Sequence, residues 1–187
     1  MLMCGGYKMR LNIPDADFGI IESFLPEPDK AFNWLIANED WQQYTHNGYK
    51  APRLNKQYGK GYTYSGVSTK DSEIPTHYQR LIDMVMKRTG FLGTQILLNL
   101  YEANGSIGLH SDSEPELGYN PTIVSLSLGS DCIFTLVNNK TKAEYNIELK
   151  ANSLLIMGNM SQVLYRHQIK KGNIKGKRIS ITFREIE

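Results

Sequence analysis

Two imidazoles and one carboxylate are the side chains of this sequence best suited to chemistry. His110 and Asp112 lie two residues apart in the segment SIGLHSD, which reads as a β-strand. Successive side chains of a strand point to opposite faces, so these two point the same way. His167 lies in a second strand-like segment, QVLYRHQI. Two histidines and a carboxylate can form the facial triad that binds Fe(II) and leaves positions open for a cosubstrate and dioxygen.

The triad needs support from elsewhere, because His-x-Asp pairs arise often by chance and a lone histidine in a strand is commonly structural. The C-terminal segment RISITFR provides that support. Its alternation places four polar side chains on one face: Arg178, Ser180, Thr182 and Arg184. A guanidinium that faces into a barrel requires an anion, since a buried unpaired charge is costly. Asn99 and Tyr101 share a face of ILLNLYE in the same way. This polar set suits a small dicarboxylate held beside iron.

Eight short strands after Thr94 would position these side chains, and turn signals such as ANGS and NNKTK separate several of them. The predicted strands are residues 94–102, 106–112, 122–129, 131–137, 143–149, 152–158, 162–169 and 178–186.

The first half of the chain is predicted to contain one strand, at 18–25, and two helices. The first helix is expected within PDKAFNWLIANEDW. The second, within IPTHYQRLIDMVMKRTG, has an apolar stripe and is expected to end at Gly90. The stripe comprises Tyr78, Leu81, Ile82, Val85 and Met86. We therefore expect an α+β fold: a double-stranded β-helix (jelly-roll) core with the two N-terminal helices packed outside.

Composition fits one intracellular domain. The chain has 187 residues, of which 41% are hydrophobic, and a net charge of +2 that names no partner. Two cysteines make no disulfide framework, which fits a reducing compartment. We find neither a signal peptide nor an apolar run long enough to span a membrane. We expect a monomer, in the cytoplasm or the nucleus depending on the host.

Three segments in order carry a resemblance to a known family. They are LLNLYEANGSIGLHSDSEPELGYNPTIVSLSLG, SLLIMGNMSQVLYRHQI and RISITFR, and PRLNKQYGKGYTYSG adds a fourth. Together they resemble the AlkB family of Fe(II)- and 2-oxoglutarate-dependent dioxygenases, which repair alkylated nucleic acid. The resemblance covers residues 18–187, with a substrate lid at 49–66 and a jelly-roll core at 94–187. Residues 1–17 would form a separate N-terminal segment.

The resemblance implies a role for each site residue. Iron would be bound by His110, Asp112 and His167. The cosubstrate 2-oxoglutarate would be held by Asn99, Tyr101, Arg178, Ser180 and Arg184, with Arg184 at its far carboxylate. The substrate base would meet Arg53, Tyr62, Tyr64, His110 and Glu114. Ser180 and Ser113 stand where many members have Asn and Asp, so the contacts they make are expected to differ.

The implied reaction is oxidative demethylation of bases such as 1-methyladenine and 3-methylcytosine, with O₂ as oxidant and formaldehyde and succinate as products. The expected partner is single-stranded DNA or RNA, with duplex also open, because a target base must leave its stack. Phosphates could be met by lid lysines such as Lys56 and Lys60 and by a C-terminal cluster of Lys170, Lys171, Lys175 and Lys177. Such clusters are equally typical of solvated loops. Two alternatives remain: a dioxygenase of this fold acting on protein or another non-nucleic substrate, and a catalytically silent binding module.

Overall fold

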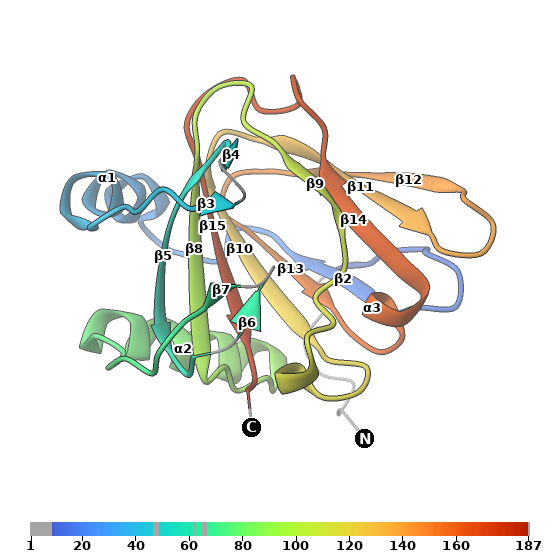
Figure 1. Cartoon of the computed structure of the whole chain (residues 1–187), viewed down its shortest axis with the longest axis horizontal. Coiled ribbons are helices and arrows are strands. Elements are labelled where there is room, and N and C mark those ends of the chain that lie inside the picture. Colours follow the sequence, from blue (N-terminus) through green and yellow to red (C-terminus); the bar gives the residue numbers. More distant parts are fainter. Residues whose placement is uncertain (1–8, 47–48, 62, 65–66, 187) are drawn as a thin grey trace.

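Two antiparallel sheets face each other in the computed structural model, which describes residues 9–46, 49–61, 63–64 and 67–186 (Figure 1). The larger sheet has seven strands, in the spatial order β1 (Met9–Arg10), β2 (Phe18–Ile21), β13 (Ser153–Met157), β10 (Ile123–Gly129), β15 (Arg178–Arg184), β8 (Gln95–Tyr101) and β5 (Leu54–Gly59). The smaller sheet has four, in the order β12 (Glu144–Leu149), β11 (Cys132–Asn138), β14 (Tyr165–Ile169) and β9 (Ile107–His110). All eight strands predicted after Thr94 are present.

The larger sheet has a different character on each face. In β15, Ile179, Ile181 and Phe183 join an apolar core with the helices on the outer face. The alternate residues of β15, Arg178 and Arg184 among them, line a cavity on the inner face. A second apolar core fills the rest of the space between the two sheets. The inner face therefore combines apolar packing with a buried polar site.

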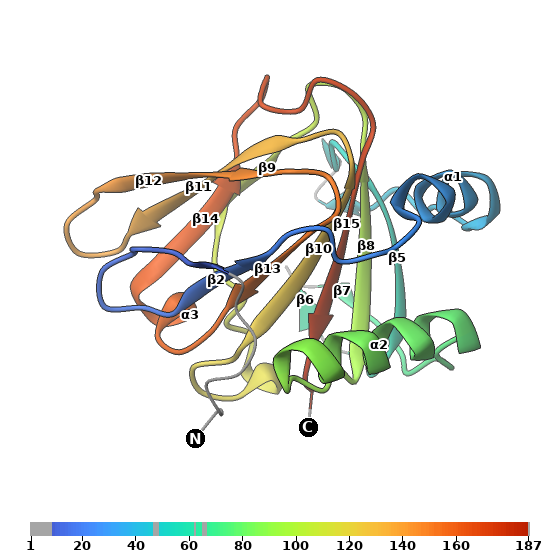
Figure 2. The ribbon, with the colours of Figure 1, turned by 180° about the vertical axis from the view of Figure 1, so that it is seen from behind.

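Helices α1 (Pro28–Asn38) and α2 (Thr76–Thr89) cover the outer face of the larger sheet (Figure 2). Helix α2 ends at Gly90, whose φ of 76° is the left-handed conformation that favours glycine at a helix end. It buries Tyr78, Ile82 and Val85. Met86, predicted to belong to the buried stripe, is 43% exposed, because at 100° per residue it lies at the margin of that stripe.

The predicted lid at 49–66 is not one loop. Its central part, Leu54–Gly59, is β5 and pairs along its length with β8 at the edge of the larger sheet. The remaining elements are two-residue strands: β3 (Thr45–His46) pairs with β4 (Tyr49–Lys50), and β6 (Thr63–Tyr64) pairs with β7 (Val67–Ser68). Two short helices complete the fold, η1 (Pro115–Leu117) and α3 (Ser161–Leu164).

Among the described residues, no helix combines the length and the apolar character needed to cross a membrane.

Candidate active site

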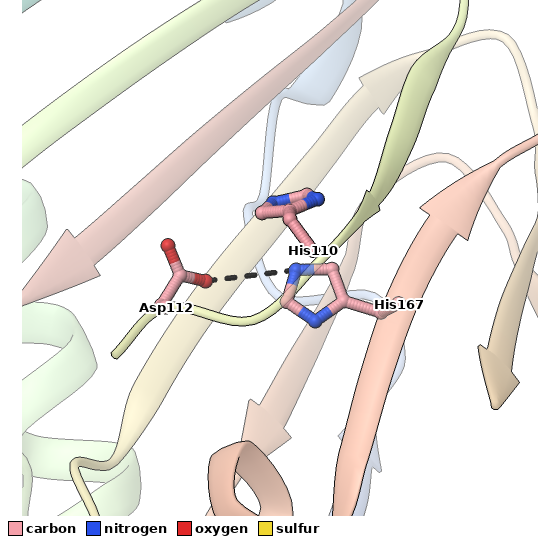
Figure 3. Close-up of side chains that lie close together, drawn as sticks. All are labelled: His110, Asp112 and His167. Carbon is pink, nitrogen blue, oxygen red and sulfur yellow. Dashed lines mark ion pairs between the residues drawn. The ribbon is translucent and has the colours of Figure 1, made fainter. Parts of the chain in front are cut away.

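The three predicted metal ligands meet at the edge of the smaller sheet (Figure 3). His110 and His167 are register partners across the antiparallel pair β9–β14, and their ring centroids lie 4.3 Å apart. Asp112 follows two residues after the end of β9. One ligand atom from each residue lies within 4.8 Å of the others. This separation allows all three to bind a single ion.

The tautomer of His110 is set by its own strand. Its Nδ1 lies 2.8 Å from the carbonyl oxygen of Gly108. Because that oxygen can only accept, the proton of a neutral His110 ring is held on Nδ1. The lone pair on Nε2 is then available to a metal, the arrangement commonly found in histidine ligands. His167 is fixed differently, by stacking on Phe134 with centroids 5.1 Å apart.

Asp112 is buried and paired with Arg184. The Nη2 and Nε atoms of Arg184 donate to Asp112 Oδ1 at 2.5 and 3.2 Å. Burial alone would raise the pKa of Asp112, but the charges of Arg184 and of the two histidines outweigh it and lower the pKa to about 2. The carboxylate is therefore ionised at neutral pH. Its second oxygen, Oδ2, lies 3.6 Å from His167 Nε2 and remains directed at the triad.

Burial also keeps His167 neutral. It lowers the pKa of His167 to about 3, and the neighbouring His110 acts in the same direction while Asp112 opposes it. A metal binds the neutral form of imidazole, so protons do not compete for this ligand near neutral pH.

Arg178, at the other end of β15 from Arg184, lies in a different environment. Its side chain is 1% exposed and no carboxylate pairs with it among the described residues. Nη2 donates to Ser127 Oγ at 2.8 Å, and the guanidinium lies 5.6 Å from the centroid of the Tyr101 ring. Nε and Nη1 have no hydrogen-bond partner within the described part of the chain. A buried guanidinium with two unused donors is suited to an anionic ligand.

One cavity contains all the residues predicted for iron and 2-oxoglutarate. The resemblance implies that Arg184 meets the far carboxylate of 2-oxoglutarate. In the structure, where no ligand tests that role, Arg184 pairs with Asp112 beside the other two predicted metal ligands. Ser180, which stands in place of the family's usual Asn, forms a 2.9 Å hydrogen bond with Ser125 across the strand pair β10–β15.

The residues predicted to contact the substrate do not all line this cavity within the described part of the chain. Arg53 lines the same cavity, and its Nε donates to Asn99 Oδ1 at 3.0 Å. Glu114 is half-buried, and burial raises the pKa of its carboxyl group. Tyr62 lies outside the described residues. Tyr64 ends β6, but its side chain is also outside the described part.

Several lysines proposed to contact phosphate have acidic partners. Lys56 pairs with Asp40 and Lys60 with Asp71. In the C-terminal cluster, Lys170 pairs with Glu144 and Lys177 with Glu102. Exposed ion pairs of this kind contribute only about 0–1 kcal/mol, so a phosphate could displace them. They nevertheless reduce the weight of these lysines as evidence for a nucleic-acid surface.

Sequence reasoning missed three polar residues that hold the site. Ser127 accepts from Arg178, Gln95 accepts from Arg184 at 3.4 Å, and Gln162 accepts from the main chain of Asp112. Ser127 had a signal, because serines alternate with apolar residues in TIVSLSLG and mark a polar face. Gln162 had none, since its partner is 50 residues away in the sequence.

Comparison with known proteins agrees with this geometry. The family model described as "2OG-Fe(II) oxygenase superfamily" matches residues 17–184. The Bos taurus protein named Alpha-ketoglutarate-dependent dioxygenase alkB homolog 3 is 32% identical over 183 residues, covering 87% of this chain and 63% of that protein. The Bos taurus DNA oxidative demethylase ALKBH2 is 26% identical over 151 residues, covering 74% of this chain and 54% of that protein. The chain thus spans less than two thirds of the length of these relatives.

A solved structure described as "The structure of OsALKBH1" has the same fold, with a TM-score of 0.64 at 20% sequence identity. The similarity covers 90% of this chain and 97% of that one. The family model matches nearly the whole chain, and the AlkB-family relatives and the His-Asp-His cluster agree with that match. The chain belongs to the 2OG-Fe(II) oxygenase superfamily.

Proposed function

We propose that this dioxygenase removes N-methyl groups from damaged bases, such as 1-methyladenine and 3-methylcytosine, in single-stranded DNA or RNA. The observation that carries the proposal is the single cavity in which the buried triad and the buried Arg178 guanidinium lie together. The names of the relatives, a dioxygenase and a DNA oxidative demethylase, direct the substrate assignment toward nucleic acid.

We assign the iron to Nε2 of His110, Nε2 of His167 and Oδ2 of Asp112. The donor set fits Fe(II), since imidazole and carboxylate are ligands that it accepts and three of them leave coordination positions open. Bound iron, with 2-oxoglutarate and O₂, supplies the oxidation that hydroxylates the methyl carbon and releases succinate and CO₂. The hydroxymethyl group then leaves as formaldehyde and restores the base.

We assign the far carboxylate of 2-oxoglutarate to Arg178. Its Nη1 has no partner and could donate to one carboxylate oxygen, with the second N–H of the neighbouring Nη2 available to the other, and the aromatic ring of Tyr101 lies against the same guanidinium. Ser180, two residues along the same strand, and Asn99, its register partner on β8, provide polar groups beside it. Arg184 then acts at the other end, where it holds Asp112 and lies close enough to the iron site to meet the near end of the cosubstrate.

We assign the substrate base to the side of the site nearest the lid. Tyr62 or Tyr64 would stack on the base opposite His110, and Glu114 would meet its polar edge. Burial raises the pKa of this carboxyl group, and its ionised form would accept hydrogen bonds from the base. Arg53, held by Asn99, would link this side to the cosubstrate pocket. Methylation of the Watson–Crick edge weakens pairing, so such a base leaves its stack at low cost.

We further propose that residues 18–187 act as one catalytic domain, that the enzyme is a monomer, and that it works in the cytoplasm or nucleus.

A panel of substrates tests the proposal. Formaldehyde release would be measured with 1-methyladenine in single-stranded DNA, duplex DNA and RNA of matched sequence, and with an N-methylated peptide. We expect release from a single-stranded oligomer and none from the peptide. Release from the peptide alone would favour a dioxygenase acting on protein. If 2-oxoglutarate binds but no succinate forms under any condition, the chain is a silent binding module.

A further inference from the structure

The main chain at Asp112 leaves the sheet at a buried position. Strand β9 ends at His110, so the N–H of Asp112 is not part of its ladder. A buried N–H without an acceptor carries a large desolvation penalty. The acceptor here is the side-chain oxygen of Gln162, at 2.9 Å. Both residues are almost fully buried, with 2% of Asp112 and 4% of Gln162 exposed.

The orientation of the Gln162 amide follows from its surroundings. An N–H can only donate, so the atom facing Asp112 must be the amide oxygen. The amide nitrogen then donates to Ser161 Oγ at 3.2 Å and lies 3.7 Å from Met157 Sδ. Every polar atom of this side chain is therefore committed, and the amide cannot turn without losing the bond to Asp112.

The position of Gln162 in the fold links the two halves of the metal site. It lies on the short helix α3, which runs directly into β14, the strand that carries His167. The segment with His110 and Asp112 comes from the other side of the β9–β14 pair. The Gln162–Asp112 bond therefore joins both ligand-bearing segments at a point where the strands no longer pair.

We propose that Gln162 is a positioning residue for the metal: it fixes the main chain of Asp112 so that the carboxylate meets the ion in one geometry. Arg184 fixes Oδ1 of the same residue, so Asp112 is held at both ends before any metal binds. Partners of this kind orient metal ligands, and their loss typically lowers metal affinity by about 10- to 100-fold. The inference rests on the triad assigned above.

Gln162→Met tests the proposal, because it retains length and apolar contact but removes the acceptor. The measurement is the dissociation constant for Co(II) with 2-oxoglutarate present, by calorimetry, together with the rise in melting temperature that Co(II) produces. We expect the dissociation constant to rise by about 10-fold or more. Ser161→Ala, which removes a neighbouring contact of Gln162 but leaves the acceptor, should bind Co(II) as the wild type does.

Two further comparisons keep the outcome clear. If Gln162→Met does not fold, Gln162→Asn replaces it, since the shorter side chain retains the amide but cannot reach Asp112. Wild-type affinity in the folded variant, or an equal loss in Ser161→Ala, would overturn the proposal. Asp112→Asn provides the reference. If Asp112→Asn also binds Co(II) normally, the triad assignment itself fails. If only the Gln162 variant binds normally, the triad stands and the positioning role falls.

Discussion

The cosubstrate side of the cavity and the lid side are built differently. Arg178 and Arg184 lie on β15, a central strand paired along its length with both β10 and β8. On the lid side, β6 and β7 are two residues each, and within the described part of the chain they pair with one another alone. A hydrogen bond joins β6 to η1, the short helix that follows Asp112: the main-chain N–H of Thr63 donates to Glu116 Oε1 at 3.0 Å.

This difference separates two tasks. Strands paired on both sides hold buried charged groups in fixed positions, as a metal and a small dicarboxylate require. Strand pairs of two residues make few hydrogen bonds and open at low free-energy cost, as the entry of a polymeric substrate requires. We therefore expect changes on the sheet to impair cosubstrate chemistry, and changes on the lid to impair only the turnover of nucleic acid.

The largest effect is expected for Asp112→Asn. The amide oxygen can still accept from Arg184, but the negative charge that binds iron is lost. Turnover should be abolished while circular dichroism and cooperative unfolding are retained. Asp112→Ala is a poorer choice, because an unpartnered buried Arg184 would cost about 3–5 kcal/mol of folding free energy. Full activity of Asp112→Asn with added Fe(II) would contradict the triad.

Replacement of both Tyr62 and Tyr64 by Ala should have the next largest effect, confined to nucleic acid. Loss of stacking costs about 1–3 kcal/mol per base, or roughly 5- to 150-fold in kcat/KM for a methylated oligomer. Decarboxylation of 2-oxoglutarate without substrate should change little. An equal loss of both activities would show that these residues belong to the cosubstrate side, and the contrast drawn between the regions would fail.

Arg178→Lys should impair the cosubstrate side alone. Lysine retains the charge but loses the planar pair of donors, so the 2-oxoglutarate concentration for half-maximal succinate formation should rise about tenfold, equivalent to about 1.4 kcal/mol. Arg184→Lys is the matched variant on the same strand. It should weaken metal binding more than 2-oxoglutarate binding, because Arg184 holds Asp112. If Arg184→Lys instead weakened 2-oxoglutarate binding more than Arg178→Lys does, Arg184 would be the residue that binds the far carboxylate.

The smallest effect is expected at Glu116. Glu116→Ala removes the acceptor for the Thr63 N–H and should raise KM for the oligomer by about two- to fivefold. Glu116→Gln, which retains an acceptor oxygen, should stay near the wild-type value. The 2-oxoglutarate requirement should be the same in all three proteins. A change in the 2-oxoglutarate requirement would show that the Thr63–Glu116 hydrogen bond also affects cosubstrate binding.

Several strands after residue 94 are predictable because apolar and polar residues alternate in them, as in β10 and β15. RISITFR separates apolar from polar residues at every step, and that alternation is what divides the outer core from the cavity. The segment LNKQYG carries no such signal, so the sequence predicts no strand within the lid at 49–66, where the structure has β5. It forms because β8 offers a free edge to pair with, which is a tertiary effect that local sequence does not encode.

The identity of the site residues was predictable, but their partners were not. Four polar side chains on one face of β15 indicated a buried anion site. The sequence does not reveal which of the two arginines lies beside the metal ligands. Arg184 pairs with Asp112, which is 72 residues away in the sequence, and only the fold brings the two together. Nothing in the sequence around Gln162 distinguishes it from other polar residues in short connecting segments. Its role becomes visible only because the fold brings it to Asp112.

The most direct measurement counts succinate and formaldehyde in one reaction, with 1-methyladenine in a single-stranded oligomer as substrate. We predict that the two products form in a one-to-one ratio, that both require Fe(II) and 2-oxoglutarate, and that neither forms with Asp112→Asn. Succinate without formaldehyde on every methylated oligomer would contradict the substrate assignment. Formaldehyde released by Asp112→Asn at the wild-type rate would contradict the active site itself.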